Sequence, residues 1–417
     1  MYSWNIMFNY LMNIKHEYSK NFNDFDTASF KGMCEKTGRD QFLLDTYITE
    51  YKIPQGRLVL VKYNLLNGMK DIYINQNSIY REGRSLVINI DTDEIVLCPF
   101  RKFFNIDEIP ETSMSVVIGK IQNSDLVEFS NKLDGSFQQF RWYKDSIVYS
   151  GSSALDIDLS PQLKMGVDIF KSDSNYMKLC KDNPDYTFIF ECILTSDPHI
   201  VNYDNDSLRL IGARNVFNGK ILFYKDIINL AEKYHLPHTT IESTTLDRII
   251  SQKSKFKSNE KEGWVINVVN NNESTLYKFK CDDYVVLHHV LEAMSSHNTI
   301  IKVMADGKYD DIISQIPAEH KQRVEDIADK LRYFMIMKIN IINFYFNKIK
   351  NIEDRKEFAL AAKRDVPKEF VKYMFMRRMG QDIQLLKKQF KDQIQYIKMS
   401  EVENFIEKNE ALYKSLT

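Results

Sequence analysis

The spacing of apolar positions changes along the chain. Between about residues 57 and 280 they fall in short runs separated by Gly, Pro, Asn and Asp, which is typical of strands joined by turns. Two short amphipathic stretches, 226–234 and 244–251, interrupt this pattern and predict helices. The strands expected from it are 57–63, 86–90, 94–98, 137–143, 146–150, 187–194, 208–214, 220–224, 264–269 and 275–280.

Both ends of the chain have a helical period. Residues 1–50 mix this period with polar breaks, which predicts a helix and loops packed on the next domain. Beyond residue 287 the period is long, with Gly only at 307 and 380 and Pro only at 317 and 367. We therefore expect an α+β domain with mixed or antiparallel sheets at 1–292, followed by an all-α domain at 293–417.

Composition narrows the class of protein. With 417 residues and 44% apolar content, the chain can bury the cores of about two domains. Its five cysteines are scattered and include no Cys-x-x-Cys pair, which predicts a reduced intracellular protein without disulfides or a zinc cluster. We expect no signal peptide and no membrane span, because the most apolar helix candidate, 333–346, contains Lys338, Asn340 and Asn343. The expected location is the cytoplasm.

Charge is spread unevenly although the net charge is only −1. Residues 348–398 contain 14 Lys and Arg against 7 Asp and Glu, so this stretch carries about +7. Its basic pairs Arg377-Arg378 and Lys387-Lys388 are interleaved with aromatic residues. Such a stretch suits a phosphate backbone, and a simply solvated helix surface is the alternative.

The strongest chemical signal is Lys132-Leu133-Asp134-Gly135. A lysine amine can attack the α-phosphate of ATP and carry AMP through a P–N bond, provided that it is deprotonated, which burial and neighbouring cations favour. Alone, this tetrapeptide also fits a charged turn. It is followed in order by Phe190-Glu191, Glu262-Gly263-Trp264 and Lys278-Phe279-Lys280. On a strand, the amines of Lys278 and Lys280 share one face, which suits the phosphates of ATP.

This ordered series resembles that of the covalent nucleotidyltransferases, which include DNA ligases, RNA ligases and mRNA capping enzymes. Finer matches resemble one branch, the phage RNA ligase 1 family that repairs broken tRNA. They are Lys62-Tyr63-Asn64 and the stretches 83–88, 101–105 and 284–288. The resemblance implies an ATP-grasp-like ligase domain and a cytoplasmic, monomeric RNA ligase, located in the host cell if a bacteriophage encodes it.

The activity implied by the resemblance joins an RNA 5′-phosphate to a 3′-hydroxyl. ATP loads AMP onto Lys132, AMP passes to the RNA 5′ end, and the 3′-hydroxyl then displaces it. Mg²⁺ or Mn²⁺ neutralises phosphate charge throughout. The implied partner is RNA, either single-stranded ends or a nicked tRNA anticodon loop. A DNA ligase or a capping enzyme, and a non-catalytic RNA-binding protein on a ligase fold, remain as alternatives.

The resemblance also suggests residue roles. Lys132, Asp134, Gly135, Lys278 and Lys280 form the expected catalytic set. Glu262 is the expected metal ligand, and Glu191 is expected to contact the ribose or help to place the metal; a buried pair with a lysine is the alternative for each. Arg84 and Lys102 are expected at the ATP phosphates, near the aromatic residues Tyr63 and Phe104, for which core packing is an equal alternative.

One stretch of the chain differs from the family's pattern, and three histidines resemble a metal site. The family has a functional lysine in a Ser-Lys-Gly-Ser segment, but the matching stretch 149–153 has none, and Lys164 or a lysine of 253–261 is the expected replacement. His288, His289 and His297 have no further ligand at suitable spacing, which indicates helix-surface histidines rather than a metal cluster.

Overall fold

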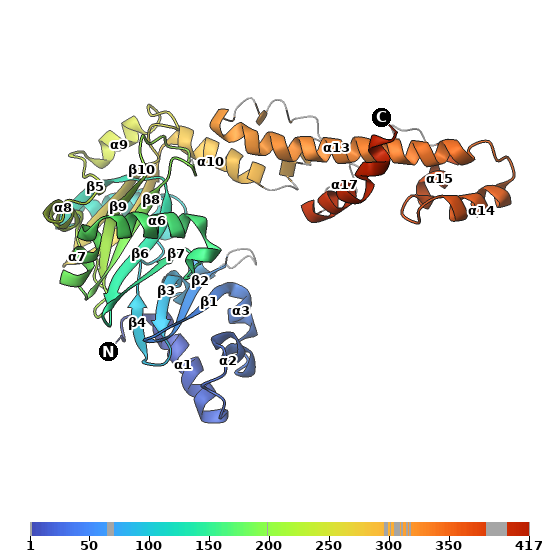
Figure 1. Cartoon of the computed structure of the whole chain (residues 1–417). Coiled ribbons are helices and arrows are strands. Elements are labelled where there is room, and N and C mark those ends of the chain that lie inside the picture. Colours follow the sequence, from blue (N-terminus) through green and yellow to red (C-terminus); the bar gives the residue numbers. More distant parts are fainter. Residues whose placement is uncertain are drawn as a thin grey trace. The chain divides into compact units, whose positions relative to one another are not determined.

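The computed structural model divides the chain into two compact units, Met1–Val285 and Val286–Thr417. It describes residues 2–64, 71–197, 199–295, 299–300, 302–303, 309, 312–313, 316, 318–380 and 398–416 (Figure 1). The division falls within helix α10 (Asp282–Ser295), and the boundary expected at residue 293 falls within the same helix.

Three antiparallel sheets form the framework of the first unit (Figure 1). One has the strand order β1 (Thr46–Ile53), β2 (Gly56–Tyr63), β3 (Arg84–Asn89), β4 (Glu94–Leu97). Another has the order β11 (Glu273–Lys280), β10 (Gly263–Asn270), β5 (Leu126–Lys132). The third has the order β7 (Ser146–Gly151), β6 (Ser136–Tyr143), β8 (Tyr186–Ile193), β9 (Ser207–Asn215).

Helices cover the outer faces of two of these sheets. Helix α1 (Ile6–Asn21), with α2 (Phe30–Lys36) and α3 (Asp40–Asp45), shares a buried core with β2 and β3. Helices α6 (Pro161–Ser172), α7 (Ser174–Asp182) and α8 (Tyr224–Lys233) pack on β6, β8 and β9, where Phe140 stacks on Phe170 with ring centroids 4.3 Å apart. The shorter elements are α4 (Asp71–Ile74), α5 (Met114–Gln122), α9 (Leu246–Gln252) and the 3-10 turns Ile79–Arg81, Pro110–Thr112 and Ile157–Leu159.

Strand β2 has an unbroken apolar run because both of its faces are buried. Val59 and Val61 belong to the core beneath α1, whereas Leu58 and Leu60 pack with Tyr143 and Val148 of the β6–β7 hairpin. A strand buried on both sides reads as a continuous hydrophobic run rather than an alternation. The first sheet is therefore sandwiched between the N-terminal helices and the third sheet.

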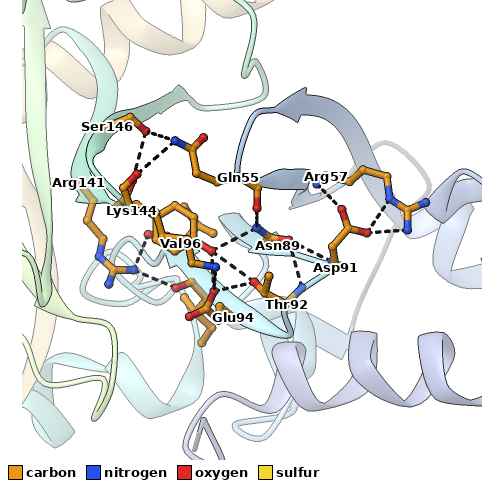
Figure 2. Close-up of polar contacts among 12 residues, drawn as sticks. Gln55, Arg57, Asn89, Asp91, Thr92, Glu94, Val96, Arg141, Lys144 and Ser146 are labelled. Atoms are coloured by element: carbon orange, nitrogen blue, oxygen red, sulfur yellow. Dashed lines mark hydrogen bonds and ion pairs between the residues drawn. The ribbon is translucent and has the colours of Figure 1, made fainter. Parts of the chain in front are cut away.

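Polar contacts fasten the first sheet to the turn of the β6–β7 hairpin (Figure 2). Glu94 accepts hydrogen bonds from Tyr143 and Thr92 and pairs with Lys144 at 2.6 Å. The side-chain amide of Gln55 donates to the Lys144 carbonyl and to Ser146 Oγ, and Arg141 Nη1 donates to the carbonyls of residues 95 and 96. The two sheets are thus joined by directional bonds as well as by apolar packing.

The second unit is helical in the part of it that the structure describes. After α10 it contains α13 (Ala318–Ile349), α14 (Arg355–Asp365), α15 (Val371–Arg378) and α17 (Met399–Lys414) around one apolar core. No helix among the described residues is both long and apolar enough to cross a lipid bilayer. Lys387, Lys388 and His297 lie outside the described residues.

The predicted α+β class, with antiparallel sheets and a helical C-terminal region, is confirmed. The strand expected at 220–224 is wrong, because Ile221 makes only an isolated bridge to Arg214 and α8 begins at Tyr224. Strands β1 and β5 were not predicted. Lys132 consequently ends β5 rather than standing at the start of a strand, and a short turn separates it from β6.

Candidate active site

Three charged side chains meet where the strands of the β11-β10-β5 sheet end. Gly263 of β10 is paired with Lys132 of β5 on one side and with Lys280 of β11 on the other. Glu262 directly precedes Gly263 and is buried. Its carboxylate accepts from Lys132 Nζ at 2.7 Å and from Lys280 Nζ at 3.0 Å. The sheet register therefore places one carboxylate between two ammonium groups.

A glycine is required at the centre of this arrangement. Gly263 has a φ of +149°, and a Cβ there would lie 2.2 Å from the Phe279 carbonyl oxygen. A side chain would push β10 away from β11 and separate Glu262 from Lys280. The apolar strand that follows, with Trp264 fully buried, anchors the carboxylate in position.

The turn after Lys132 brings Glu191 of β8 to the same place. The Gly135 N–H donates to Glu191 Oε1 at 3.1 Å. A Cβ on Gly135 would lie 2.6 Å from the Cys192 carbonyl oxygen and 3.0 Å from Glu191 Cγ, so this close approach of turn and strand needs glycine. The β5–β6 turn thus joins the second and third sheets at the predicted nucleophile.

Asp134 holds the surroundings of the site together. Its Oδ2 accepts from the backbone N–H groups of Ile200 and Val201 at 2.9 and 3.1 Å, and its Oδ1 accepts from the Tyr284 hydroxyl at 3.0 Å. The Asp134 N–H donates to the Tyr203 hydroxyl. With both carboxylate oxygens engaged, Asp134 fixes the turn that carries Lys132 instead of touching the amine itself.

A cavity of about 260 Å³ opens beside Lys132. Its lining includes Lys132, Gly135, Glu191, Lys278 and Arg84, together with aromatic side chains at positions 100, 103 and 137. Five of the residues singled out from the sequence therefore share one cavity. Its mixture of apolar walls and a few charged groups is typical of a small-molecule site.

Phe103 is in contact with two cations of this cavity. Lys278 Nζ is 4.8 Å and the Arg84 guanidinium 5.1 Å from its ring centroid. The segment that carries Phe103 is bonded to β11 through Lys278 N–H to the Phe104 carbonyl, at 2.9 Å. Cation–π attraction to this ring therefore partly stabilises both cations.

Lys102 lines a second, larger groove instead. Lys102 Nζ is 5.4 Å from the Tyr63 ring centroid and 5.1 Å from that of Phe104, which is buried. This basic groove, of about 490 Å³, is defined by the cations Arg81, Arg101, Lys102, Lys120, Arg214 and Lys220 among its lining residues, which include the acids Glu111 and Glu273. Phe100 and Phe103 border both the groove and the cavity.

The charges around Lys132 favour its ammonium form, whereas the sequence analysis expected surroundings that favour the neutral amine. Burial favours the neutral amine, but the carboxylates of Glu262, Glu191 and Asp134 outweigh it and raise the pKa of Lys132 above its usual value. Burial likewise opposes ionisation of Glu262, yet Lys132 and Lys280 hold its pKa below the usual value. Before any ligand binds, Lys132 is thus an ammonium ion, and the surrounding cations do not deprotonate it.

Glu191 and Lys278 show the effect of burial most strongly. Burial raises the pKa of Glu191 to about 7, although Lys132 acts in the opposite direction. Burial, followed by the charges of Arg84, Lys132, Lys102 and Lys280, holds the pKa of Lys278 well below its usual value. A cation near Glu191 would favour the charged form of this acid, and an anion near Lys278 would favour the charged form of this amine.

Glu191 and Glu262 are the residues of the site that could hold a divalent cation. Glu191 and Glu262 both act electrostatically on Lys132 and on each other. Within the described residues no group of three or more His, Cys, Asp or Glu side chains is arranged to hold a metal. Two carboxylates are what Mg²⁺ commonly takes from a protein when phosphate oxygens and water complete its shell.

Sequence reasoning missed three residues of this region. Phe103 stands within the quoted stretch 101–105, but nothing in its composition distinguishes it from Phe104. Tyr203 and Tyr284 reach Asp134 from far along the chain, which only the fold reveals. His288 and His289 lie on helix α10, where His288 is 3.9 Å from Glu292.

The middle of the chain is similar to known proteins. Residues 82–285 match a family profile described as RNA ligase, and they contain every predicted site residue except Tyr63. We call this matched stretch the RNA ligase domain. The match confirms the resemblance to the phage RNA ligase 1 family. The matched region ends where the first compact unit ends, so the helical unit lies outside it.

Two curated relatives share this RNA ligase domain at low identity. A protein of Thermovibrio ammonificans provisionally named an RNA ligase is 23% identical over 305 residues, covering 70% of this chain and 76% of its own. A protein of Autographa californica nuclear polyhedrosis virus provisionally named a bifunctional polynucleotide kinase/RNA ligase is 21% identical over 249 residues. That match covers 57% of this chain and 35% of the viral protein, so the chain spans about a third of the viral relative.

Solved structures give distant matches. The Naegleria gruberi RNA ligase with pyrophosphate has a TM-score of 0.35 and 16% identity, covering 42% of this chain and 55% of that one. A protein of Aquifex aeolicus provisionally named an ATP-dependent DNA ligase has a TM-score of 0.43 and 14% identity, covering 85% of this chain and 80% of that one.

Proposed function

We propose that this protein is an ATP-dependent RNA ligase that works through an AMP adduct on Lys132. The observation that carries the proposal is the position of Lys132. Its amine lies in a cavity with Lys278 and Arg84 and is held by a buried carboxylate, in a chain with an RNA ligase domain. A lysine amine that lies beside other cations suits attack on a phosphate group of a nucleotide.

In the proposed first step the Lys132 nitrogen attacks the α-phosphorus of ATP. A P–N bond forms, the bond from the α-phosphorus to the oxygen that bridges to the β-phosphate breaks, and pyrophosphate leaves. The RNA 5′-phosphate then displaces Lys132 from AMP, and a 3′-hydroxyl finally displaces AMP from the RNA end. Lys278 and Lys280 stabilise the negative charge that develops on the phosphoryl oxygens.

The pair between Lys132 and Glu262 determines when the amine becomes reactive. A divalent cation on Glu262 and Glu191, Mg²⁺ in this proposal, would neutralise the carboxylates and lower the pKa of Lys132 towards the neutral amine. In the resting site Glu262 Oε2, 2.7 Å from the amine, holds the ammonium form, and the proton would leave to solvent when the metal takes up this carboxylate. The resting ion pair would thus keep the nucleophile protonated until ATP and metal arrive together.

The RNA partner is supported by the basic groove next to the cavity. Six cations and two acids line it. Arg81 and Arg214 are buried in ion pairs with Glu111 and Glu82, which leaves Arg101, Lys102, Lys120 and Lys220 to meet a phosphate backbone. Cations that follow the phosphate backbone are a usual means of holding single-stranded nucleic acid. We infer that RNA ends are the substrate, and that a nicked tRNA anticodon loop is the preferred form.

The proposal is tested by trapping the adduct. The full chain is incubated with ATP labelled at the α-phosphate and with Mg²⁺, and we expect acid-labile, alkali-stable label on the wild type and on Lys171→Ala. Lys171 is exposed on helix α6 and serves as the lysine control. Absence of label on the wild type would contradict the proposal and favour a non-catalytic RNA-binding protein.

The alternative function, that of a DNA ligase or a capping enzyme, is tested with the same preparation of the protein. Matched RNA and DNA strands with 5′-phosphate and 3′-hydroxyl ends are offered, and we expect the RNA strand to be sealed preferentially. Sealing of DNA alone, or transfer of a guanylate to a 5′-diphosphate end, would contradict an RNA ligase.

A further inference from the structure

Strands β2 and β3 place two cations directly opposite each other. Lys62 of β2 is the register partner of Arg84 of β3, immediately after an irregularity between Val61 and Lys62. Directly opposite residues of an antiparallel pair project from the same face, and like charges in that arrangement repel. An irregular register redirects side chains and often occurs near functional sites. The pair therefore needs an explanation beyond folding.

Neither cation of this pair is neutralised by a carboxylate in the described ion pairs. Lys62 Nζ is 3.4 Å from the Ser152 hydroxyl, and the Arg84 guanidinium lies over the Phe103 ring. Arg84 Nη1 is buried and has no hydrogen-bond partner in the described structure. Burial and then the Arg84 charge hold the pKa of Lys62 below its usual value. A buried donor without an acceptor is destabilising, and an anion at this position would supply the missing acceptor.

The backbone around the pair is fixed firmly enough to form a binding site. Ser85 adopts a φ of 69°, a left-handed conformation that is uncommon for residues other than glycine, and its hydroxyl donates to the Ser152 carbonyl at 2.6 Å. The buried Gln139 amide donates to the Ser85 carbonyl and to Ser150 Oγ. These bonds fasten the end of β7 to the start of β3. A residue in such a conformation often marks a functional position.

We propose that Lys62 is a phosphate-binding residue of the nucleotide site, and that it holds the outer phosphates of ATP together with Arg84. The inference rests on the proposed function. Arg84 lines the cavity that contains Lys132, and Lys62 extends the row of cations from that cavity towards Ser152. The outer phosphates of ATP carry the negative charge that would neutralise this pair.

Lys62 also accounts for the stretch 149–153, which contains no lysine. The replacements expected from the sequence are engaged elsewhere or exposed. Lys253 pairs with Asp282 and Lys261 pairs with Glu242. The exposed ones are Lys164, Lys255 and Lys257. Lys62 instead reaches this stretch from a neighbouring strand and contacts Ser152. The positive charge near the β6–β7 hairpin thus comes from β2.

The decisive measurement is binding of inorganic tripolyphosphate to the full chain by calorimetry, with AMP as the second probe. We expect Lys62→Gln to weaken tripolyphosphate binding about tenfold or more while AMP binding is unchanged, because one charge-assisted contact is lost. Lys62→Arg should retain most of the affinity, and Lys171→Ala, at an exposed lysine of α6, should match the wild type. Thermal melting of each variant verifies that it is folded.

Kinetics separates this inference from the proposed function. For adduct formation, Lys62→Gln should raise the KM for ATP more than it lowers kcat. Adding Ser152→Lys to Lys62→Gln should recover tripolyphosphate binding, since it returns a cation to the same place. A folded Lys62→Gln protein that binds tripolyphosphate as tightly as the wild type overturns the inference. A wild type that binds tripolyphosphate but traps no AMP overturns only the proposed function.

Discussion

At the scale of single residues, the site is organised around the pairing of Lys132 with Glu262. One carboxylate serves two lysines, and its burial makes both pairs strong. Removing Glu262 would leave two partly buried ammonium groups without their acceptor, whereas removing Lys132 leaves Glu262 still paired with Lys280. Variants of these two residues are therefore not equivalent, and Lys132 is the better position at which to test the chemistry.

We predict that Lys132→Ala abolishes adduct formation, by about a thousandfold or more, because the nucleophile itself is lost. Joining of RNA that already carries a 5′ adenylate should remain partly intact, since that step needs Lys278, Lys280 and Glu262 but no amine at residue 132. Gel assays of trapped label and of joined RNA measure the two steps. An adduct on the variant would assign the nucleophile to another residue.

Arg84→Ala and Lys102→Ala should weaken adduct formation from ATP more than joining of pre-adenylated RNA. The two residues line different spaces, so we expect a loss of about ten- to a hundredfold for Arg84 and a smaller loss for Lys102. Single-turnover rates of both steps provide the measurement. An equal loss in both steps would instead indicate a folding role or a contact with RNA.

The residue types of the site could be predicted from the sequence, but their partners could not. Lys132, Glu191, Lys278 and Arg84 were chosen from local patterns, and they line one cavity. Asp134 was chosen too, yet its hydrogen-bond partners lie about 65 to 150 residues further along the chain. No local pattern encodes such contacts, because they depend on how the sheets pack.

At the scale of elements, strands with strongly apolar runs were predicted well and polar ones were not. Strand β10 is buried along nearly its whole length because β5 and β11 flank it, and its apolar run is unmistakable. Strand β1 alternates Tyr, Thr, Glu and Lys at an exposed edge, so its sequence resembles a loop. Strand β5 ends in the polar residues Ser130, Asn131 and Lys132, so its sequence did not indicate a strand that continues as far as Lys132.

The contact between the first sheet and the β6–β7 turn should depend on pH. Burial favours the neutral form of Glu94, but hydrogen bonds from Lys144, Thr92 and Tyr143 outweigh it and lower its pKa to about 2. A carboxyl group whose pKa is lower in the folded state stabilises the fold above its unfolded pKa. That contribution is lost as the pH falls from about 4.5 towards about 2.

Glu94→Gln should therefore reduce the free energy of unfolding at pH 7 by about 1 kcal/mol, a value that allows for solvent screening of this partly exposed group. Urea denaturation at pH 7 and at pH 3 measures the difference between the variant and the wild type. We expect the difference to shrink at the lower pH. A constant difference would mean that Glu94 acts through packing and not through its charge.

At the scale of the whole molecule, the RNA ligase domain and the helical unit are predicted to have separate tasks. A chain ending at Ser295 keeps helix α10 and the bond between Tyr284 and Asp134, so it should still form the adduct. We expect it to lose the preference for a nicked hairpin over a plain single strand. Competition assays at low and high salt measure this preference, because phosphate contacts by the basic stretch 348–398 would be salt-dependent.

The shortened chain gives a clear contrary outcome as well. If it folds, forms the adduct and keeps the same substrate preference at every salt concentration, the helical unit does not select RNA. The basic residues of α15, such as Arg377 and Arg378, would then be solvated surface charges.

The five cysteines can report on unfolding of the first compact unit alone. All five cysteines are buried, and burial raises the pKa of Cys34 and Cys192 to about 12 and of Cys98 and Cys281 to about 11. Thiolates, which react with alkylating reagents, should form only when the protein opens. Every cysteine precedes Val286, so the helical unit has none. Mass spectrometry of alkylated protein along a urea series should therefore follow opening of the first compact unit alone. Circular dichroism of the helices follows both units. Separation of the two curves would reveal independent unfolding, and coincident curves would reveal a single cooperative molecule.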